Sequence, residues 1–248
     1  MCTLIILRQP GQAWPLMLAA NRDEMAGRPW KPPGRHWPDR PDVVAGQDEL
    51  AGGSWLGIND HGVVAGILNR VGSLGALAGK RSRGELVLEA LDHADAALAA
   101  KALSDLDPRA YRPFNLMIAD SQDAFWLKND GRRIETATIP QGIHMLTAHD
   151  LDDVASPRIQ AFLPRFKAAP LPSPDKEDWT AWKELMATRA PGRVSEDAAL
   201  LIEREDGFGT VSSALIALPQ PNPGQHPLFL FAPGPPDRTE FTLLPPSG

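Results

Sequence analysis

The chain has 248 residues, of which 43% are hydrophobic, and a formal net charge of −6 at pH 7. It is long enough to bury a large core, and its single cysteine excludes an internal disulfide and a cysteine-based zinc cluster. The negative charge argues against a nucleic-acid partner. No run of about 18 apolar residues predicts a membrane span, and no signal-peptide pattern opens the chain, so we expect a cytoplasmic protein.

The first third of the chain predicts short strands. Apolar runs at 3–8 and 16–20 flank a loop rich in glycine and proline, which indicates two joined strands. The stretch 28–41 contains too much proline for a helix or a central strand, so we expect a surface loop there. The runs 54–58 and 63–69 flank "NDHG", which is typical of a tight hairpin turn.

From Gly84 onward the apolar spacing becomes helical, with Val87, Leu91, Ala94 and Leu98 on one face. The remaining expected elements are a hairpin over 114–130, a strand over 132–139, helices over 151–166, 179–187 and 195–205, and strands over 210–218, 228–232 and 239–244. Strands at both ends, with helices grouped between them, favour one α+β domain over residues 1–248.

The cysteine lies at position 2, directly after the initiator methionine. Removal of Met1 would leave a free α-amine and a thiol on one residue. Their reference pKa values are about 7.7–8.0 and 8.5, so the amine can accept the thiol proton near neutral pH. Cys2 is therefore either a chance occurrence or a nucleophile that carries its own base.

Four polar residues, Asn21 to Glu24, follow the apolar run at 16–20. At the end of a strand such a run is usually a solvated turn. Close to an N-terminal cysteine, an aspartate can hold the α-ammonium, an arginine can lower the thiol pKa, and an asparagine can donate to an oxyanion. The hairpin prediction brings this run near Cys2, which makes Asn21, Arg22 and Asp23 candidate catalytic residues.

Several motifs in order resemble the NRDE family, whose eukaryotic members are called transport and Golgi organisation protein 2. They are "MCTLI", "LAANRDE", "GRPW", "AGGSWLGIN", "GILNR", "SRGELV", "RPFNLMIAD", "GIHMLT" and "FGTVSSALIAL". The family in turn is similar to N-terminal-nucleophile hydrolases such as the bile-salt and penicillin V acylases. Those enzymes also begin Met-Cys-Thr and carry an Asn-x-Asp pair, matched here by Asn21 and Asp23.

The resemblance implies an α+β fold of two antiparallel sheets, a four-layer αββα sandwich, with Cys2 at a central strand. Asp23 would correspond to the acylase aspartate that holds the α-amine. Three positions depart from the pattern. Ala20 stands where the acylases have an arginine, so Arg22 would have to replace it, and the family usually has asparagine and arginine at Ala148 and Val211. Loss of an oxyanion donor lowers the rate by about 10²–10³.

Other residues are candidates for substrate binding, each with a plainer alternative. Gly53, Ser54 and Trp55 either form a loop of backbone donors over the site or serve a bend and a core. Asn69 and Arg70 either bind substrate or form a solvated strand end. "SRG" at 82–84 either binds substrate or caps a helix.

His149 is a candidate because it follows Ala148, but a lone histidine is most often structural. The six histidines have no metal-ligand spacing, so we expect no metal site and no cofactor. The loop at 28–41, with Trp30, Trp37 and four basic residues, either covers a sheet edge or roofs an apolar pocket with a cationic rim.

Two functions remain open on the sequence. The first is a cysteine hydrolase that cleaves a non-peptide amide of a small amphipathic molecule such as an acyl amide. The second, also implied by the resemblance, is a non-catalytic protein that handles haem or lipid on the same scaffold. The sequence does not specify the oligomeric state.

Overall fold

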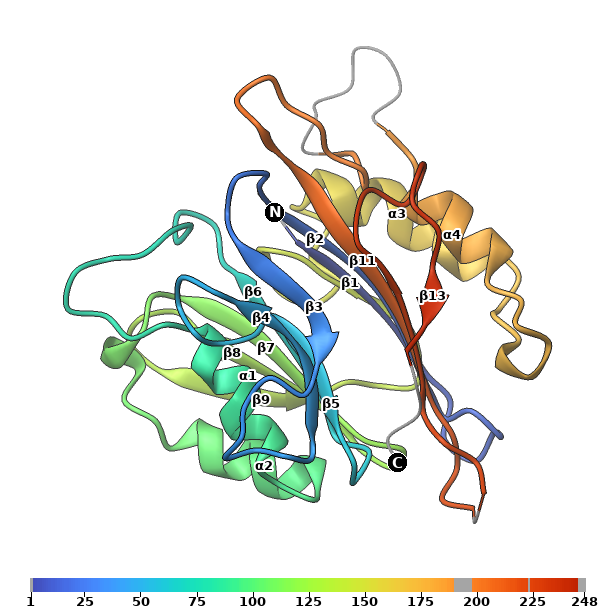
Figure 1. The fold of residues 1–248 in the computed structure, drawn as a ribbon, viewed down its shortest axis with the longest axis horizontal. Coiled ribbons are helices and arrows are strands. Elements are labelled where there is room, and N and C mark those ends of the chain that lie inside the picture. The colour runs from blue at the N-terminus through green and yellow to red at the C-terminus, as the bar shows by residue number, and fades with distance from the viewer. Residues whose placement is uncertain (1, 190–197, 223, 245–248) are drawn as a thin grey trace. The chain divides into compact units, whose positions relative to one another are not determined.

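The computed structural model describes residues 2–189, 198–222 and 224–244. The chain divides into two compact units (Figure 1). Met1–Arg28 and Gln141–Pro246 form the first, which we call the terminal unit, and Pro29–Pro140 form the second, the central unit. Each unit has its own sheet and its own hydrophobic core. The prediction of a single domain stays a prediction.

The terminal unit contains a six-stranded antiparallel sheet in the order β10-β1-β2-β11-β12-β13. Its strands are β1 (Thr3–Arg8), β2 (Leu16–Met25), β10 (Gly142–Leu146), β11 (Phe208–Leu218), β12 (Leu228–Ala232) and β13 (Thr242–Leu243). Its helices are α3 (Pro157–Ala168) and α4 (Thr180–Met186), with a 3-10 turn at Pro174–Lys176. The strand β1 therefore lies between β10 and β2, inside the sheet rather than at its edge.

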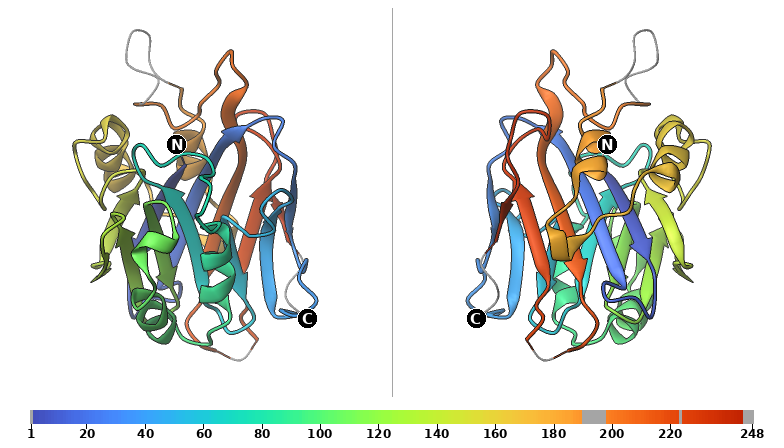
Figure 2. Two further views of the ribbon diagram at one scale, coloured as in Figure 1. Left: turned by 90° about the vertical axis from the view of Figure 1, so that its left-hand side faces the viewer. Right: turned by 90° about the vertical axis from the view of Figure 1, so that its right-hand side faces the viewer.

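Alternate side chains of β1 and β2 face opposite sides of this sheet. Ile5, Leu7, Met17 and Ala19 pack in one core with side chains of α3 and α4. Both helices lie on one side of this sheet (Figure 1 and, from two sides, Figure 2). The intervening residues Leu4, Ile6, Leu16 and Leu18, which point to the other face, are buried as well. A strand that is buried on both faces needs apolar residues at every position, which explains the continuous apolar runs of the sequence.

The central unit contains a seven-stranded antiparallel sheet whose strands are neighbours in chain order, β3 to β9. They are β3 (Trp30–Gly34), β4 (Val43–Asp48), β5 (Leu56–Asn59), β6 (Val64–Asn69), β7 (Phe114–Ala119), β8 (Ala124–Asn129) and β9 (Ile134–Thr138). The helices α1 (Gly84–Leu91) and α2 (Ala96–Ser104), followed by a 3-10 turn at Pro108–Ala110, pack against this sheet in a second core.

The α+β prediction with antiparallel sheets is confirmed. The predicted hairpins over 54–69 and 114–130, the strand over 132–139, the helix over 179–187 and the strands over 210–218 and 228–232 are also confirmed. The strand predicted over 239–244 is shortened to Thr242–Leu243. No helix in the described ranges is both long and apolar enough to cross a bilayer.

Two strand predictions were wrong. The second strand continues through the polar run to Met25, because β11 pairs with it along that whole length. The stretch 28–41 is not only loop, since Trp30–Gly34 form an edge strand. Its prolines are tolerated because an edge strand leaves one row of its backbone groups unpaired, and the register shifts between Lys31 and Gly34.

Three helix predictions were also wrong in part. The helix beginning at Gly84 ends at Leu91, and α2 starts after Asp95, whose side chain accepts a hydrogen bond from the Leu98 amide as an N-cap. The helix predicted over 151–166 begins at Pro157, where proline suits the first helical turn. Of the helix predicted over 195–205, residues 195–197 lie outside the described residues, and no α-helix covers 198–205.

Candidate active site

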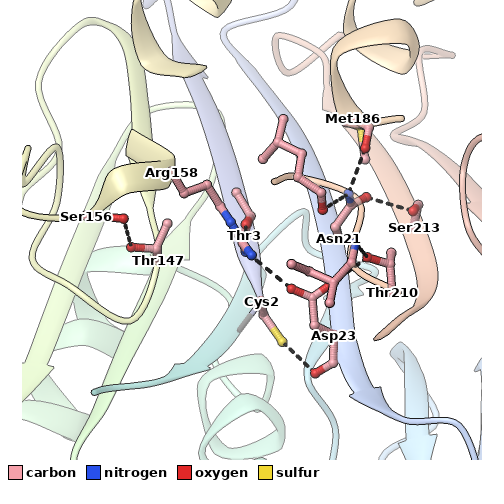
Figure 3. Close-up of polar contacts among 12 residues, drawn as sticks. Cys2, Thr3, Asn21, Asp23, Thr147, Ser156, Arg158, Met186, Thr210 and Ser213 are labelled. Atoms are coloured by element: carbon pink, nitrogen blue, oxygen red, sulfur yellow. Dashed lines mark hydrogen bonds and ion pairs between the residues drawn. The ribbon is translucent and has the colours of Figure 1, made fainter. Parts of the chain in front are cut away.

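Cys2 directly precedes β1 and is half-buried. Its thiol donates to the backbone carbonyl of Asp23 across a distance of 3.7 Å (Figure 3). Thr3 pairs with Asn21 in the β1–β2 register, so one further step along the strands places Cys2 opposite Arg22. The predicted approach of Cys2 to the 21–24 run is thus seen in the terminal unit.

The surroundings of Cys2 raise its thiol pKa above the ordinary value. Burial is the main cause, and the negative charge of Asp23 adds to it. A backbone hydrogen bond from Asp23 and the positive charge of Arg22 act in the opposite direction. With Met1 attached, the thiol therefore needs a base before it can act as a nucleophile.

The carboxylate of Asp23 is fully buried and held from two sides. Thr210 donates its hydroxyl to Oδ1 at 2.7 Å, and Arg158 Nη1 donates to Oδ2 at 3.2 Å (Figure 3). The same guanidinium nitrogen donates to the Thr3 hydroxyl oxygen at 2.6 Å. This network ties α3 and β11 to the first two strands beside Cys2.

Asn21 has a different set of partners. Its amide donates to the carbonyl oxygens of Met186 and Leu200 at 3.1 and 3.0 Å, and its oxygen accepts from Ser213 at 2.7 Å. Both N–H groups are therefore engaged, one with the last residue of α4 and the other with the backbone before β11. The structure gives Asn21 an anchoring contact and does not bring it to Cys2 as an oxyanion donor.

Arg22 lies on the other face of β2. Its neighbours Asn21 and Asp23 contact the helix side, so alternation directs Arg22 to the face that carries Cys2. It is buried, with 6% of its surface exposed, and its charge lowers the pKa of the Cys2 thiol. A catalytic role for Arg22 stays a prediction.

The strand β10 passes on the other side of β1. Leu4 pairs with Leu146, the last residue of β10, and Ala148 lies two residues further along the chain. Ala148 is buried and has no side-chain donor. The position where the family usually has asparagine is therefore apolar in this chain.

His149 follows Ala148 but turns toward its own loop. Its Nδ1 lies 3.7 Å from the Asp153 carboxylate, and its amide donates to the Thr147 hydroxyl at 3.3 Å. Thr147 in turn contacts the Ser156 hydroxyl at the start of α3. A substrate-binding role for His149 stays a prediction.

In the central unit, Gly53 serves close packing. A Cβ at Gly53 would lie 2.4 Å from the carbonyl carbon of Gly84, and the Ser54 amide donates to the Gly84 carbonyl at 2.9 Å. The Ser54 hydroxyl bonds within its own loop, to the amide and carbonyl of Leu56. The motifs "GGSW" and "SRG" thus meet, and the two glycines let their backbones touch.

The other candidates in the central unit also have local contacts. The ring of Trp55 lies over Gly46, where a Cβ would approach it to 2.3 Å, and meets Trp30 edge to face at 5.8 Å. Arg70 donates to the Asn115 side-chain oxygen at 2.7 Å. Asn69 is half-buried at the end of β6. Binding roles for these residues stay predictions.

The cationic rim expected at 28–41 is not supported, because each basic residue there meets a carboxylate. The pairs are Arg28–Glu24, Lys31–Glu49, Arg35–Asp60 and Arg40–Asp92. The alternative, that the segment covers a sheet edge, is also not what the structure shows, because Trp30–Gly34 themselves form the edge strand β3.

The sequence did not indicate Arg158, Thr3 or Thr210 as site residues. Arg158 is 135 residues from Asp23, and nothing in its local pattern shows that it is buried. Among the described residues, no three His, Cys, Asp or Glu side chains gather as a metal site would require.

Comparisons with known proteins agree with this architecture. A Caenorhabditis elegans orthologue of N-acylethanolamine-hydrolyzing acid amidase superposes with a TM-score of 0.58 at 16% identity, covering 98% of this chain and 100% of that one. A variant of conjugated bile acid hydrolase from Clostridium perfringens gives 0.57 at 11% identity, covering 98% and 92%. Penicillin V acylase from Agrobacterium tumefaciens gives 0.50 at 14%, covering 94% and 83%. The predicted N-terminal-nucleophile hydrolase fold is confirmed.

Sequence relatives carry one name. Transport and Golgi organization protein 2 homologues of Homo sapiens and Bos taurus are 35% and 34% identical over 116 and 111 residues. The alignments cover 45% and 44% of this chain, and 41% and 40% of the relatives, which is less than half of their length. A family model described as Transport and Golgi organisation 2 matches residues 1–219. The chain therefore belongs to the Transport and Golgi organisation 2 family.

Proposed function

We propose that this protein is a cysteine hydrolase with an N-terminal nucleophile, and that it cleaves a non-peptide amide of a small amphipathic substrate. The observation that carries the proposal is the position of Cys2. It directly precedes a buried central strand, and its thiol donates a hydrogen bond to the backbone carbonyl of Asp23. The likeness to an amidase, an acylase and a hydrolase of the same fold supports it.

The reaction begins once Met1 has been removed. The α-amine of Cys2 takes the thiol proton, and the thiolate attacks the amide carbonyl to form a tetrahedral oxyanion. Collapse of that intermediate breaks the C–N bond, and the α-ammonium gives its proton to the leaving amine. The acyl group remains on Cys2 as a thioester. Water, deprotonated by the α-amine, then releases the carboxylic acid and restores the thiol.

Asp23 and Arg22 supply the electrostatics of this scheme. The buried Asp23 carboxylate orients the α-ammonium. Its negative charge also favours the protonated form of the amine, which must be present when the α-ammonium gives its proton to the leaving amine. Arg22, on the face of Cys2, stabilises the developing oxyanion. Ala148 contributes no donor, so we expect a slow enzyme compared with one that has asparagine there.

The test uses protein shown by intact mass to lack Met1. It is incubated with N-acylethanolamines, N-acyl amino acids and amide conjugates of amphipathic acids, and free amine is measured over many turnovers. Turnover that is lost in Cys2→Ala, with an unchanged circular dichroism spectrum, is the expected result. Equal turnover in Cys2→Ala would contradict the proposal.

The same experiment distinguishes the hydrolase from the haem- or lipid-handling alternative. A carrier would bind about one ligand per chain without product formation, and haem would quench tryptophan fluorescence equally in the wild type and in Cys2→Ala. Absence of turnover with every amide, together with such binding, would replace the hydrolase proposal by the carrier.

A further inference from the structure

A β-bulge lies in β11 where it passes the site. Thr210 pairs with Asp23, but the next pair along β2 is Ser212 with Arg22, so Val211 is the extra residue. A bulge bends its strand and redirects the side chains that follow. Here it changes which face of the sheet each of the two consecutive serines occupies.

The hydrogen bonds identify those faces. Thr210 bonds to Asp23 and Ser213 bonds to Asn21, so both lie on the side of α3 and α4, although they are three positions apart. Ser212 lies between them and pairs with Arg22. It therefore points to the opposite face, the face of Arg22 and Cys2.

Ser212 is 1% exposed, and its hydroxyl has no hydrogen-bond partner. A buried hydroxyl without a partner lowers stability, because it has lost water and gained nothing in return. Alanine would fill the same space without that penalty. A serine at this position indicates a bond that forms only when something else is bound.

Across the sheet, Cys2, Arg22 and Ser212 form one row, with Cys2 directly before β1, Arg22 on β2 and Ser212 on β11. Neighbouring strands are about 4.8 Å apart, so Arg22 lies roughly 5 Å and Ser212 roughly 10 Å from Cys2, measured between backbones. The row offers a thiol, then a buried guanidinium, then a hydroxyl donor.

We infer that Arg22 and Ser212 form a subsite beside Cys2 that binds an anionic group of the substrate. A guanidinium and a hydroxyl both donate hydrogen bonds, and together they suit a carboxylate, sulfonate or phosphate. The inference rests on the proposed function for the reaction at Cys2. It specifies the substrate as an amide that carries an acid group within a few bonds of the carbonyl.

Alkylation of Cys2 tests this subsite without any substrate. The Cys2 thiolate displaces iodide from the same type of carbon in iodoacetate and in iodoacetamide, but only iodoacetate carries a carboxylate. Cys2 is the only thiol in the chain. We expect the rate ratio of iodoacetate to iodoacetamide to exceed that of a cysteine peptide by about 10-fold, as one charge-assisted hydrogen bond allows. Ser212→Ala should lower this ratio several-fold, and Arg22→Gln should lower it further.

Ser213→Ala is the matched control, because this neighbouring serine is equally buried but faces the helices. It should leave the ratio unchanged. Ser212→Thr, which keeps the hydroxyl, should retain the preference for iodoacetate. Ser212→Ala should also melt at the wild-type temperature or above it, which a structural serine would not do.

A wild-type ratio equal to that of the peptide would overturn the inference. So would a Ser212→Ala variant that slows both reagents equally, because that outcome means a general change around the thiol. Amide turnover does not enter these measurements. Amide turnover without a preference for iodoacetate would contradict the anion subsite but not the proposed hydrolase. A preference for iodoacetate without amide turnover would contradict the hydrolase but not the subsite.

Discussion

Arg158 Nη1 lies 3.2 Å from Asp23 Oδ2, with 3% and 0% of the two side chains exposed. The aspartate that we expect to hold the α-amine of Cys2 is thus already paired with a cation from α3. A carboxylate has room for both partners, since its two oxygens accept about four hydrogen bonds. The position of α3 and the charge balance beside Cys2 are therefore coupled.

Replacement of Arg158 tests how much the Arg158–Asp23 ion pair contributes to the free energy of unfolding. Removing one partner of a buried ion pair typically costs about 3–5 kcal/mol, because the other charge stays buried. We expect Arg158→Met to lower the free energy of unfolding by this order in urea denaturation. Lys167→Met on the same helix is the control, because Lys167 is exposed. An equal decrease in the free energy of unfolding in both variants would mean that the buried ion pair does not stabilise the protein more than an exposed lysine does.

Asp23→Asn separates two effects of the carboxylate. The negative charge of Asp23 raises the Cys2 pKa, so in protein that retains Met1 the neutral side chain should lower that pKa. The pH profile of iodoacetamide labelling should then shift to lower pH. In protein without Met1, the same change removes the partner of the α-ammonium and should slow amide turnover. An unshifted profile in the first protein would show that Asp23 does not act on the thiol.

Removal of Met1 should change the reactivity of Cys2. Burial raises the thiol pKa, so protein that retains Met1 should react with iodoacetamide at pH 7 more slowly than a cysteine peptide. The α-ammonium released by processing lies on the same residue and lowers the thiol pKa, so the processed protein should react faster. Intact mass before and after labelling measures both forms in one sample. Identical rates would argue against an activating amine.

Gly53→Ala should destabilise the protein, because the new Cβ would meet the backbone of Gly84 at 2.4 Å. Backbone cannot move aside as a flexible side chain can, so we expect a loss of about 2 kcal/mol or more. Gly27→Ala is a suitable comparison, since nothing lies within 4 Å of its Cβ and its φ is not positive. Thermal unfolding of the two variants measures the difference. A melting temperature of Gly53→Ala equal to that of Gly27→Ala would refute the close approach.

Asp152 should contribute a stability that disappears in acid. Burial opposes its ionisation, but hydrogen bonds from His144 Nδ1 at 2.6 Å and the Met145 amide at 2.8 Å hold its pKa below the ordinary value. A lowered folded-state pKa stabilises the protein above the unfolded pKa of about 3.9, and this contribution is lost as the pH falls through the folded value.

Asp152→Ala should therefore cost about 1 kcal/mol at pH 6, a modest figure because the side chain is 29% exposed. The difference from wild type should shrink below about pH 4. Urea denaturation at pH 6 and pH 3.5 checks this expectation. A difference that stays constant with pH would mean that the carboxylate charge is not involved.

The site could be predicted from the sequence only where the signal is local or carried by the family motifs. Cys2 and Asp23 follow from the first strands and the resemblance. The face of Arg22 follows from alternation only once β2 is known to continue past Ala20, and the polar run at 21–24 concealed this. Pairing with β11 overrides that local preference, and no local pattern shows it.

The remaining features depend on contacts between distant residues. Arg158 is identified only by its pair with Asp23, and Gly53 only by its approach to Gly84. The side of the sheet that Ser212 occupies depends on one extra residue in β11. The sequence "GTVSS" does not show where such a bulge falls. Without its position the face of Ser212 cannot be predicted, because a shift of one residue moves every following side chain to the opposite face of the sheet.

The strands of the sheet around Cys2 leave the ribosome at different times. Thr210 bonds to Asp23 across 187 residues, and the strand on the other side of β1 begins at Gly142. A ribosome adds about 5–20 residues per second, so β1 and β2 leave it on the order of ten to forty seconds before β11 can pair with them. During that interval the start of the chain is not yet enclosed. The removal of Met1 that we propose would fall within this interval, before β10 and β11 pair with the two strands beside Cys2.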